Sequence, residues 1–238
     1  MQNQPNPQYN SNNANLVHYK WNAIFTSHSK PMQFAPTADK TTYSKAFNVS
    51  KRTGRNLWDL LAPILPDSKN KELSHALEIA LYQWMLNDPL SKRLPVDNVP
   101  FLTGLQFNSE QSLAKTMNIA VTTNRNTDNA IELIIPALIP INNISAPAKT
   151  ASLTFKIMAA TYNIEEGSEA NGYLTELNIP YNDMQQPQQN IILPVTAKPG
   201  NLIVVAMSVE YTILREANLQ VVHNLLWMPA GIIWSGYN

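Results

Sequence analysis

The longest and most β-branched run of the chain is residues 202–213, Leu-Ile-Val-Val-Ala-Met-Ser-Val-Glu-Tyr-Thr-Ile. Successive side chains of a β-strand point to opposite faces of its sheet. One face of this segment is apolar throughout, whereas the other begins apolar at Leu202 and ends polar at Thr212. The pattern predicts a central strand with one face on a core and a second face that emerges toward solvent. We interpret it as the middle of a β-sandwich.

Residues 16–25 show a second clear alternation and predict an amphipathic strand. Its apolar face carries Val17, Tyr19, Trp21, Ala23 and Phe25, and its polar face carries His18, Lys20 and Asn22. A helical region separates this strand from every other predicted strand. It therefore has to pair with a distant sheet edge, either in its own chain or in a neighbouring subunit. The candidate interface residues are Val17, Tyr19, Trp21 and Phe25.

Two helices are predicted between this strand and the rest of the chain. Apolar residues at three- and four-residue spacing indicate helices over residues 42–65 and 72–86, with Pro63 in the last turn of the first. Ser50 and Gly54 lie on the buried stripe of the first helix, where small side chains allow close approach of another element. The short connection predicts that the two helices pack antiparallel as an αα-hairpin.

The remainder of the chain has the pattern of β-structure. Short alternating runs separated by Pro- and Asn-containing turns are typical of a sandwich and not of βαβ units. The predicted strands are 101–107, 112–121, 130–135, 151–162, 173–179, 189–195, 201–213 and 219–228, with a ninth at 231–234. We therefore predict an α+β protein with an Ig-like or jelly-roll-like antiparallel β-sandwich. The predicted divisions are a polar tail and strand (1–41), a helical hairpin (42–87), a Pro-rich linker (88–100) and the sandwich (101–238).

Composition narrows the classes of function. Charged residues make up 14% of the 238 residues, and 17 Lys and Arg balance 17 Asp and Glu, so the net charge is zero. Binding of a phosphate backbone requires a basic excess, which makes nucleic acid an unfavourable partner, whereas a neutral surface favours self-association. The chain has no cysteine, which excludes disulfides, thiolate metal sites and a cysteine nucleophile.

The beginning of the sequence and its apolar runs predict where the chain is made. Residues 1–7, Met-Gln-Asn-Gln-Pro-Asn-Pro, lack the basic and apolar regions of a signal peptide. No apolar run reaches the length that crosses a membrane. We therefore expect cytoplasmic synthesis and no membrane partner, with later incorporation into an extracellular or virion-like assembly left open.

Candidate chemistry is sparse. His75 and Glu78 have the i, i+3 spacing of two metal ligands on a helix, but no second pair repeats the arrangement, which favours surface residues. Glu165, Glu166 and Glu169 lack the alternating spacing of a calcium loop, and we interpret them as a hairpin tip. Residues 124–129 form a predicted polar loop. Phosphate-binding glycine motifs and the Gly-x-Ser-x-Gly elbow are absent. The sequence predicts no catalytic residue, no metal site and no cofactor.

Basic and aromatic side chains supply the candidate residues for partner binding. Lys51, Arg52 and Arg55 form a basic side of the first helix that can meet nucleic acid or an acidic partner, and the lack of an overall basic excess disfavours nucleic acid. Trp227 and Trp234, together with Trp21 and Tyr237, can form a sugar-stacking platform or belong to a core or interface.

Several motifs resemble a family of uncharacterised Bacteroidetes proteins. They are Ser-Lys-Ala-Phe-Asn-Val-Ser-Lys-Arg-Thr-Gly-Arg-Asn-Leu-Trp at 44–58, Leu-Thr-Gly-Leu-Gln-Phe-Asn at 102–108, Ile-Ile-Pro-Ala-Leu-Ile-Pro at 134–140 and Val-Glu-Tyr at 209–211. The resemblance spans residues 44–234 and implies the same helix-then-β order. An Asn-rich tail and the strand at 16–25 stand where that family has a Gly- and Lys-rich N-terminus. The resemblance implies no activity and no catalytic residue.

These observations predict a non-enzymatic structural or interaction protein that forms a homo-oligomer or a repeating component of a larger assembly. The strand at 16–25 would pair with a sheet edge of its own or of a neighbouring subunit. Two alternatives are a ligand-binding sandwich module, for carbohydrate or protein, that uses exposed aromatics, and an enzyme whose residues are dispersed along the chain.

Overall fold

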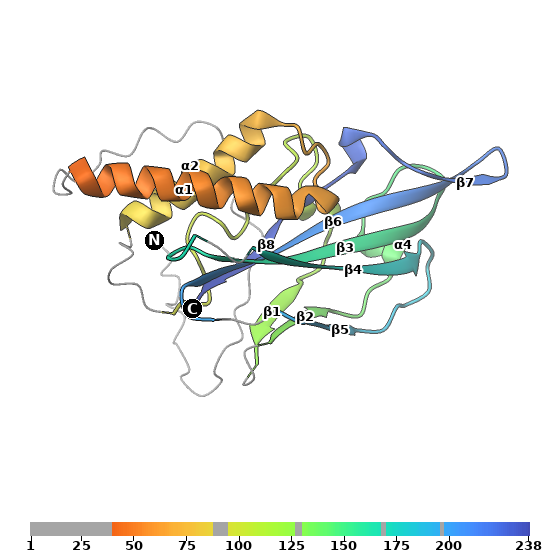
Figure 1. The fold of residues 1–238 in the computed structure, drawn as a ribbon. Coiled ribbons are helices and arrows are strands. Elements are labelled where there is room, and N and C mark those ends of the chain that lie inside the picture. The colour runs from red at the N-terminus through yellow and green to blue at the C-terminus, as the bar shows by residue number, and fades with distance from the viewer. Residues whose placement is uncertain (1–39, 88–94, 127–129, 168–169, 196–197) are drawn as a thin grey trace, which may run out of the picture.

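The computed structural model describes residues 40–87, 95–126, 130–167, 170–195 and 198–238, which form three layers (Figure 1). Helices α1 and α2 cover one face of a five-stranded antiparallel sheet, and a three-stranded antiparallel sheet packs on its other face. The predicted α+β class with a sandwich-like pair of sheets is therefore confirmed. The helical elements are α1 (Lys40–Leu61), η1 (Ala62–Ile64), α2 (Lys71–Asn87), α3 (Leu113–Thr116), α4 (Pro140–Asn143) and η3 (Leu225–Trp227). The strands are β1 (Thr122–Arg125), β2 (Ile131–Ile135), β3 (Thr150–Asn163), β4 (Asn171–Pro180), β5 (Gln189–Leu193), β6 (Asn201–Arg215), β7 (Asn218–Val221) and β8 (Ala230–Tyr237).

Strand β6 is the centre of the large sheet, as its alternation predicts. It pairs with β3 along one edge, and β3 in turn pairs with β4. Along its other edge β6 pairs first with β8, from Leu202 to Ser208, and then with β7, from Thr212 to Arg215. The small sheet has the order β1-β2-β5.

The second face of β6 is buried from Leu202 to Ser208 and becomes partly exposed at Glu210 and Thr212, as its change from apolar to polar residues predicts. The face that carries Ile203 and Tyr211 lies in the core between the two sheets. The opposite face, which begins at Leu202, packs under the helices. Where the helical layer ends, this face carries Glu210, whose carboxylate forms an ion pair of 2.9 Å with Lys156 Nζ.

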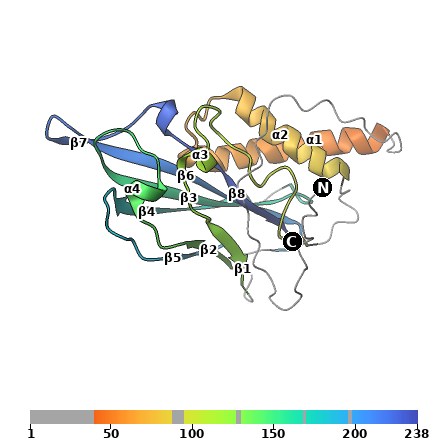
Figure 2. The same ribbon diagram turned by 180° about the vertical axis from the view of Figure 1, so that it is seen from behind.

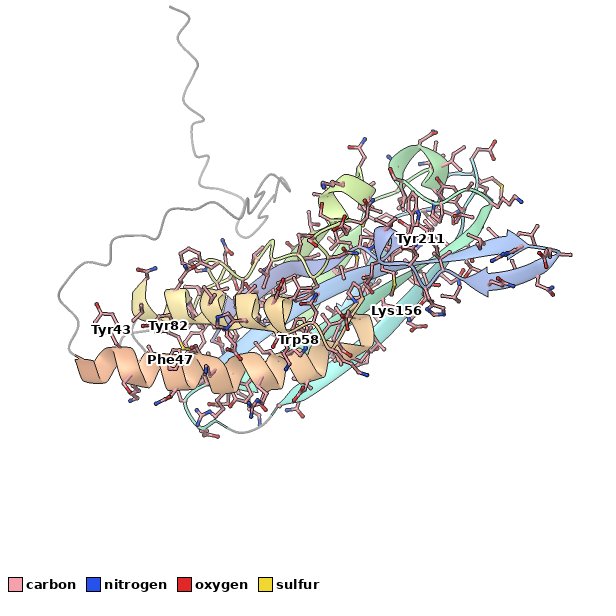
Figure 3. All side chains as sticks on the ribbon, turned by 90° about the horizontal axis from the view of Figure 1, so that it is seen from above. Tyr43, Phe47, Trp58, Tyr82, Lys156 and Tyr211 are labelled. Carbon is pink, nitrogen blue, oxygen red and sulfur yellow. The ribbon has the colours of Figure 1, made fainter. Side chains whose placement is uncertain are left out.

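The helical layer runs along the large sheet, as Figure 3 shows from above. The α1 ring of Phe47 meets the α2 ring of Tyr82 edge-on at 6.0 Å, and Gly54 lies against Glu78. Residues early in α1 thus contact residues late in α2, so the two helices run in opposite directions. Pro63 does not continue α1 but forms the short helix η1, because proline has no backbone N–H to donate to the preceding turn.

Gly54 provides the close helix approach that the small-residue stripe predicts. A Cβ atom at this position would lie 2.7 Å from Glu78 Cγ. We expect Gly54→Leu to lower the free energy of unfolding by about 1–2 kcal/mol, since overpacking forces neighbouring groups to shift. Urea unfolding followed by circular dichroism measures the change. The exposed Lys45 on the same helix gives the matched control, and Lys45→Leu is expected to change stability by less than about 0.5 kcal/mol.

Two sequence-predicted strands are wrong in part because local hydrogen bonds end or replace the β pattern. Within residues 112–121 the Ser112 side chain accepts a hydrogen bond from the Lys115 N–H and caps α3. Strand β1 begins after this range and includes Asn124 and Arg125, which were predicted to belong to a loop. The strand predicted at 219–228 ends at Val221, and Asn224 caps η3 beyond it.

Residues 96–107 run along the outer edge of β8 and form backbone hydrogen bonds with it. They are not the predicted free linker followed by a strand. Val96 and Tyr237 exchange two backbone hydrogen bonds of 2.8 Å, and Phe107 N–H donates to the Ala230 carbonyl at 2.7 Å. Val99 is fully buried in the core under the helices. Figure 2 shows this segment beside β8 from behind. The segment satisfies backbone groups that a bare edge strand would leave unpaired.

Candidate functional site

The four predicted interface residues of the N-terminal strand lie outside the described residues. These are Val17, Tyr19, Trp21 and Phe25. The sheet edges that could pair with this strand do lie within the described residues.

The outer edge of β4 has the properties of such an acceptor. Along its inner edge β4 pairs with β3 through ten residue pairs, from Ser152 with Pro180 to Thr161 with Asn171. Among the described strands none pairs with its outer edge. The outward backbone N–H and C=O groups therefore form a row that can receive another strand.

Side chains do not protect this edge against strand addition. Native edge strands commonly carry lysine, internal proline or a bulge that prevents pairing. In β4 the only charged residue is Glu176, and the only proline is the terminal Pro180. Tyr173 and Leu174 are each 38% exposed on opposite faces of the strand. Within the part of the chain that the structure describes, the outer edge of β4 is thus unpaired along its full length, in contrast to the covered edge of β8.

A second exposed apolar surface lies at the far end of the large sheet, where the β6–β7 hairpin projects beyond the helices (Figure 1). The cross-strand pair Leu214 and Leu219 is half exposed or more. Val221 of β7 and Leu225 and Leu226 of η3 add further exposed aliphatic area. This exposed surface could not be predicted from the sequence, because its apolar residues follow the same pattern as those of a buried strand.

Comparison of the chain with protein-family models, with curated proteins and with solved structures gives no match. The resemblance to the Bacteroidetes family therefore stays a prediction.

The basic side of α1 is divided among three environments. Lys51 Nζ lies 4.8 Å from the centre of the Phe47 ring. The Arg52 guanidinium donates to the Ile164 carbonyl at 3.3 Å and packs against Gly167 in the loop after β3. Arg55 instead faces the beginning of α2. Lys51, Arg52 and Arg55 are all exposed, and their binding of an acidic partner stays a prediction.

Arg55 lines an open groove of about 380 Å³ between the end of α1 and the start of α2. The groove also contains Lys69, Lys71 and His75. His75 lies 3.4 Å from the Glu78 carboxylate, so the i, i+3 pair forms an intrahelical contact. Because the Arg55, Lys69 and Lys71 side chains are exposed, salt screens their attraction for an anion.

The predicted aromatic platform is not assembled at the surface. Trp234 is 1% exposed in the core between the sheets, and the Arg125 guanidinium lies over its ring at 5.9 Å. Tyr237 is also buried and meets Trp84 edge-on at 5.6 Å. Trp227 is half-buried beside Tyr211. Burial in the core removes Trp234 from the candidate partner-binding residues, and the core interpretation applies to it.

The acidic cluster does not converge on a metal site in the described residues. Glu165 Oε1 accepts a hydrogen bond of 3.2 Å from the Tyr237 hydroxyl, and Glu166 N–H donates to Asn163 Oδ1. Ser168 and Glu169 lie outside the described residues. The described residues contain no group of three or more His, Cys, Asp or Glu that could hold a metal ion. Among the described helices none is both long and apolar enough to cross a bilayer.

Proposed function

We propose that this protein is a non-enzymatic structural or interaction protein that self-associates, as a homo-oligomer or as a repeating component of a larger assembly. In this proposal residues 16–25 form a strand that pairs with an open sheet edge of their own or of a neighbouring subunit. The sandwich-like pair of sheets is the scaffold, and we propose that it is of the Ig-like or jelly-roll-like type, with the helices as a hairpin.

The observation that carries this proposal is the difference between the two edges of the large sheet. The chain covers the β8 edge with residues 96–107, but no described strand covers the edge of β4. A strand added to that edge gains main-chain hydrogen bonds, and its apolar side chains can each contribute about 1.5–3 kcal/mol when buried. The zero net charge adds no long-range repulsion between copies.

Size-exclusion chromatography with light scattering tests the proposal. The full chain is expected at twice the subunit mass of 26.7 kDa or more. Trp21→Asp is expected to shift the protein to the subunit mass without change in circular dichroism, because a charge on the apolar face opposes burial. Asn22→Asp, on the polar face of the same segment, is the matched control and should keep the assembly. A full chain that stays at the subunit mass at high micromolar concentration would contradict self-association.

A further inference from the structure

We infer that residues 16–25 add to the outer edge of β4 as an antiparallel strand, with Lys20 directly opposite Glu176. This inference rests on the proposed function and names the site and the register of the strand pairing. It commits to one occupant of the edge, the segment of this chain that precedes α1. Length, charge and apolar pattern support the same register.

The two segments match in length. Strand β4 has ten residues, and residues 16–25 are also ten. When Lys20 faces Glu176 in an antiparallel pair, residue 16 faces Pro180 and residue 25 faces Asn171, so both strands end together. All the pairings of the large sheet are antiparallel, and the added strand continues this arrangement. Pro180 lies at the end of the pair, where a missing N–H interrupts no interior hydrogen bond.

The charges on the helical face of the sheet favour a cation at this position. Lys156 lies opposite Glu176 in the β3–β4 register, but its ammonium pairs with the Glu210 carboxylate at 2.9 Å. The Lys156 ammonium is thus engaged by Glu210, and the Glu176 carboxylate on the neighbouring strand is exposed. The ammonium of Lys20, brought opposite Glu176, balances the second carboxylate, since opposite charges stabilise directly opposed positions.

The apolar faces then coincide as well. With Lys20 and Glu176 on the helical face, the side chains on either side of them point toward the small sheet. Tyr19 faces Leu177 and Val17 faces Ile179, and these two β4 residues already pack at the core between the sheets. The added strand therefore extends this core outward. A shift of one residue would turn the apolar face of the added strand toward Glu176, which opposes that register.

The connection to α1 is long enough for this placement. In the proposed register residue 25 lies beside Asn171, and the neighbouring Gly172 approaches Leu60 near the end of α1. Lys40 begins the helix 20 residues earlier, a distance of about 30 Å at the helical rise. The 14 residues from 26 to 39 reach at most about 48 Å when extended. The connection is therefore long enough for a strand of the same chain to reach the β4 edge.

Disulfide trapping tests the register. Because the native chain has no cysteine, only the introduced residues can form a disulfide. We would prepare the full chain with Lys20→Cys and Glu176→Cys, confirm its fold by circular dichroism and oxidise it. Directly opposed Cβ atoms lie close enough for a disulfide after a small adjustment. Mass spectrometry is expected to find the peptide containing residue 20 joined to the peptide containing residue 176. The control pairs Lys20→Cys with Gln220→Cys, on the exposed strand β7, and should give at least tenfold less bridged product.

The outcomes separate the register from self-association. A bridge in a disulfide-linked dimer supports both. A bridge within one chain supports the register as a pairing inside the subunit, and self-association is then decided by the mass that light scattering measures for the unoxidised protein. An assembled protein without the bridge, or with equal bridging in the control, overturns the register and leaves self-association standing. As an independent readout, Glu176→Lys should raise the dissociation constant of the assembly, measured by light scattering, about three- to fivefold. Lys20→Glu in the same chain should restore the original dissociation constant.

Discussion

Phe155→Ala is expected to lower the free energy of unfolding by about 3–5 kcal/mol. Phe155 lies on β3 in the core between the two sheets and is fully buried. Its neighbours in register are Val209 on β6 and Leu177 on β4. Truncation of the ring removes apolar contacts and leaves a cavity, because close-packed neighbours relax only in part.

Urea unfolding at neutral pH, followed by circular dichroism, measures this loss as a lower midpoint at unchanged slope. Ile192→Ala on β5 is the control, since Ile192 is 63% exposed and its truncation should cost less than about 0.5 kcal/mol. Equal losses for the two variants would show that the sheets do not enclose a common core around Phe155.

The protein is expected to lose stability above about pH 10, and Tyr211→Phe should remove much of that loss. The Tyr211 hydroxyl donates to the Ser145 carbonyl at 2.8 Å. Burial raises the pKa of Tyr211 well above its ordinary value, and the nearby Tyr181 raises that pKa further. The unfolded chain, with an ordinary tyrosine pKa near 10, therefore releases this proton first.

A folded-state pKa above the unfolded value contributes stability that is complete below the unfolded pKa and is lost as pH rises. For one group the loss is about 1.4 kcal/mol per pH unit, so it reaches about 2 kcal/mol at pH 11.5. At neutral pH Tyr211→Phe should itself cost about 1 kcal/mol through the lost hydrogen bond.

Urea midpoints of the native protein and Tyr211→Phe at pH 8 and pH 11.5 measure the difference. Tyr173→Phe, at an exposed tyrosine of β4, controls for titration at the surface and should keep the full alkaline loss. An alkaline loss that is the same in Tyr211→Phe as in the native protein would contradict the buried, neutral state of Tyr211.

Strand β4 could be predicted from the sequence, but its position at the edge of the sheet could not. The alternation of residues 173–179 predicts β4 correctly, and the strand contains no lysine and no internal proline. Whether a strand lies at an edge depends on which other strands pair with it, and this pairing is not encoded in its own alternation. The same limit applies to Trp234. Its strand pattern is compatible with an exposed or a buried indole, and only the packing of the small sheet shows that it is buried.

The sequence by itself determined the central strand β6, the two helices and the close approach at Gly54. These features depend on periods of 2 and 3.6 residues and on small side chains, which are properties of neighbouring residues in the chain. Only the tertiary structure decided that the helices cover the second face of β6, that residues 96–107 cover β8 and that no described strand pairs with the outer edge of β4. These arrangements are contacts between residues far apart in the sequence, and they form because each apolar face and each row of backbone groups needs a partner.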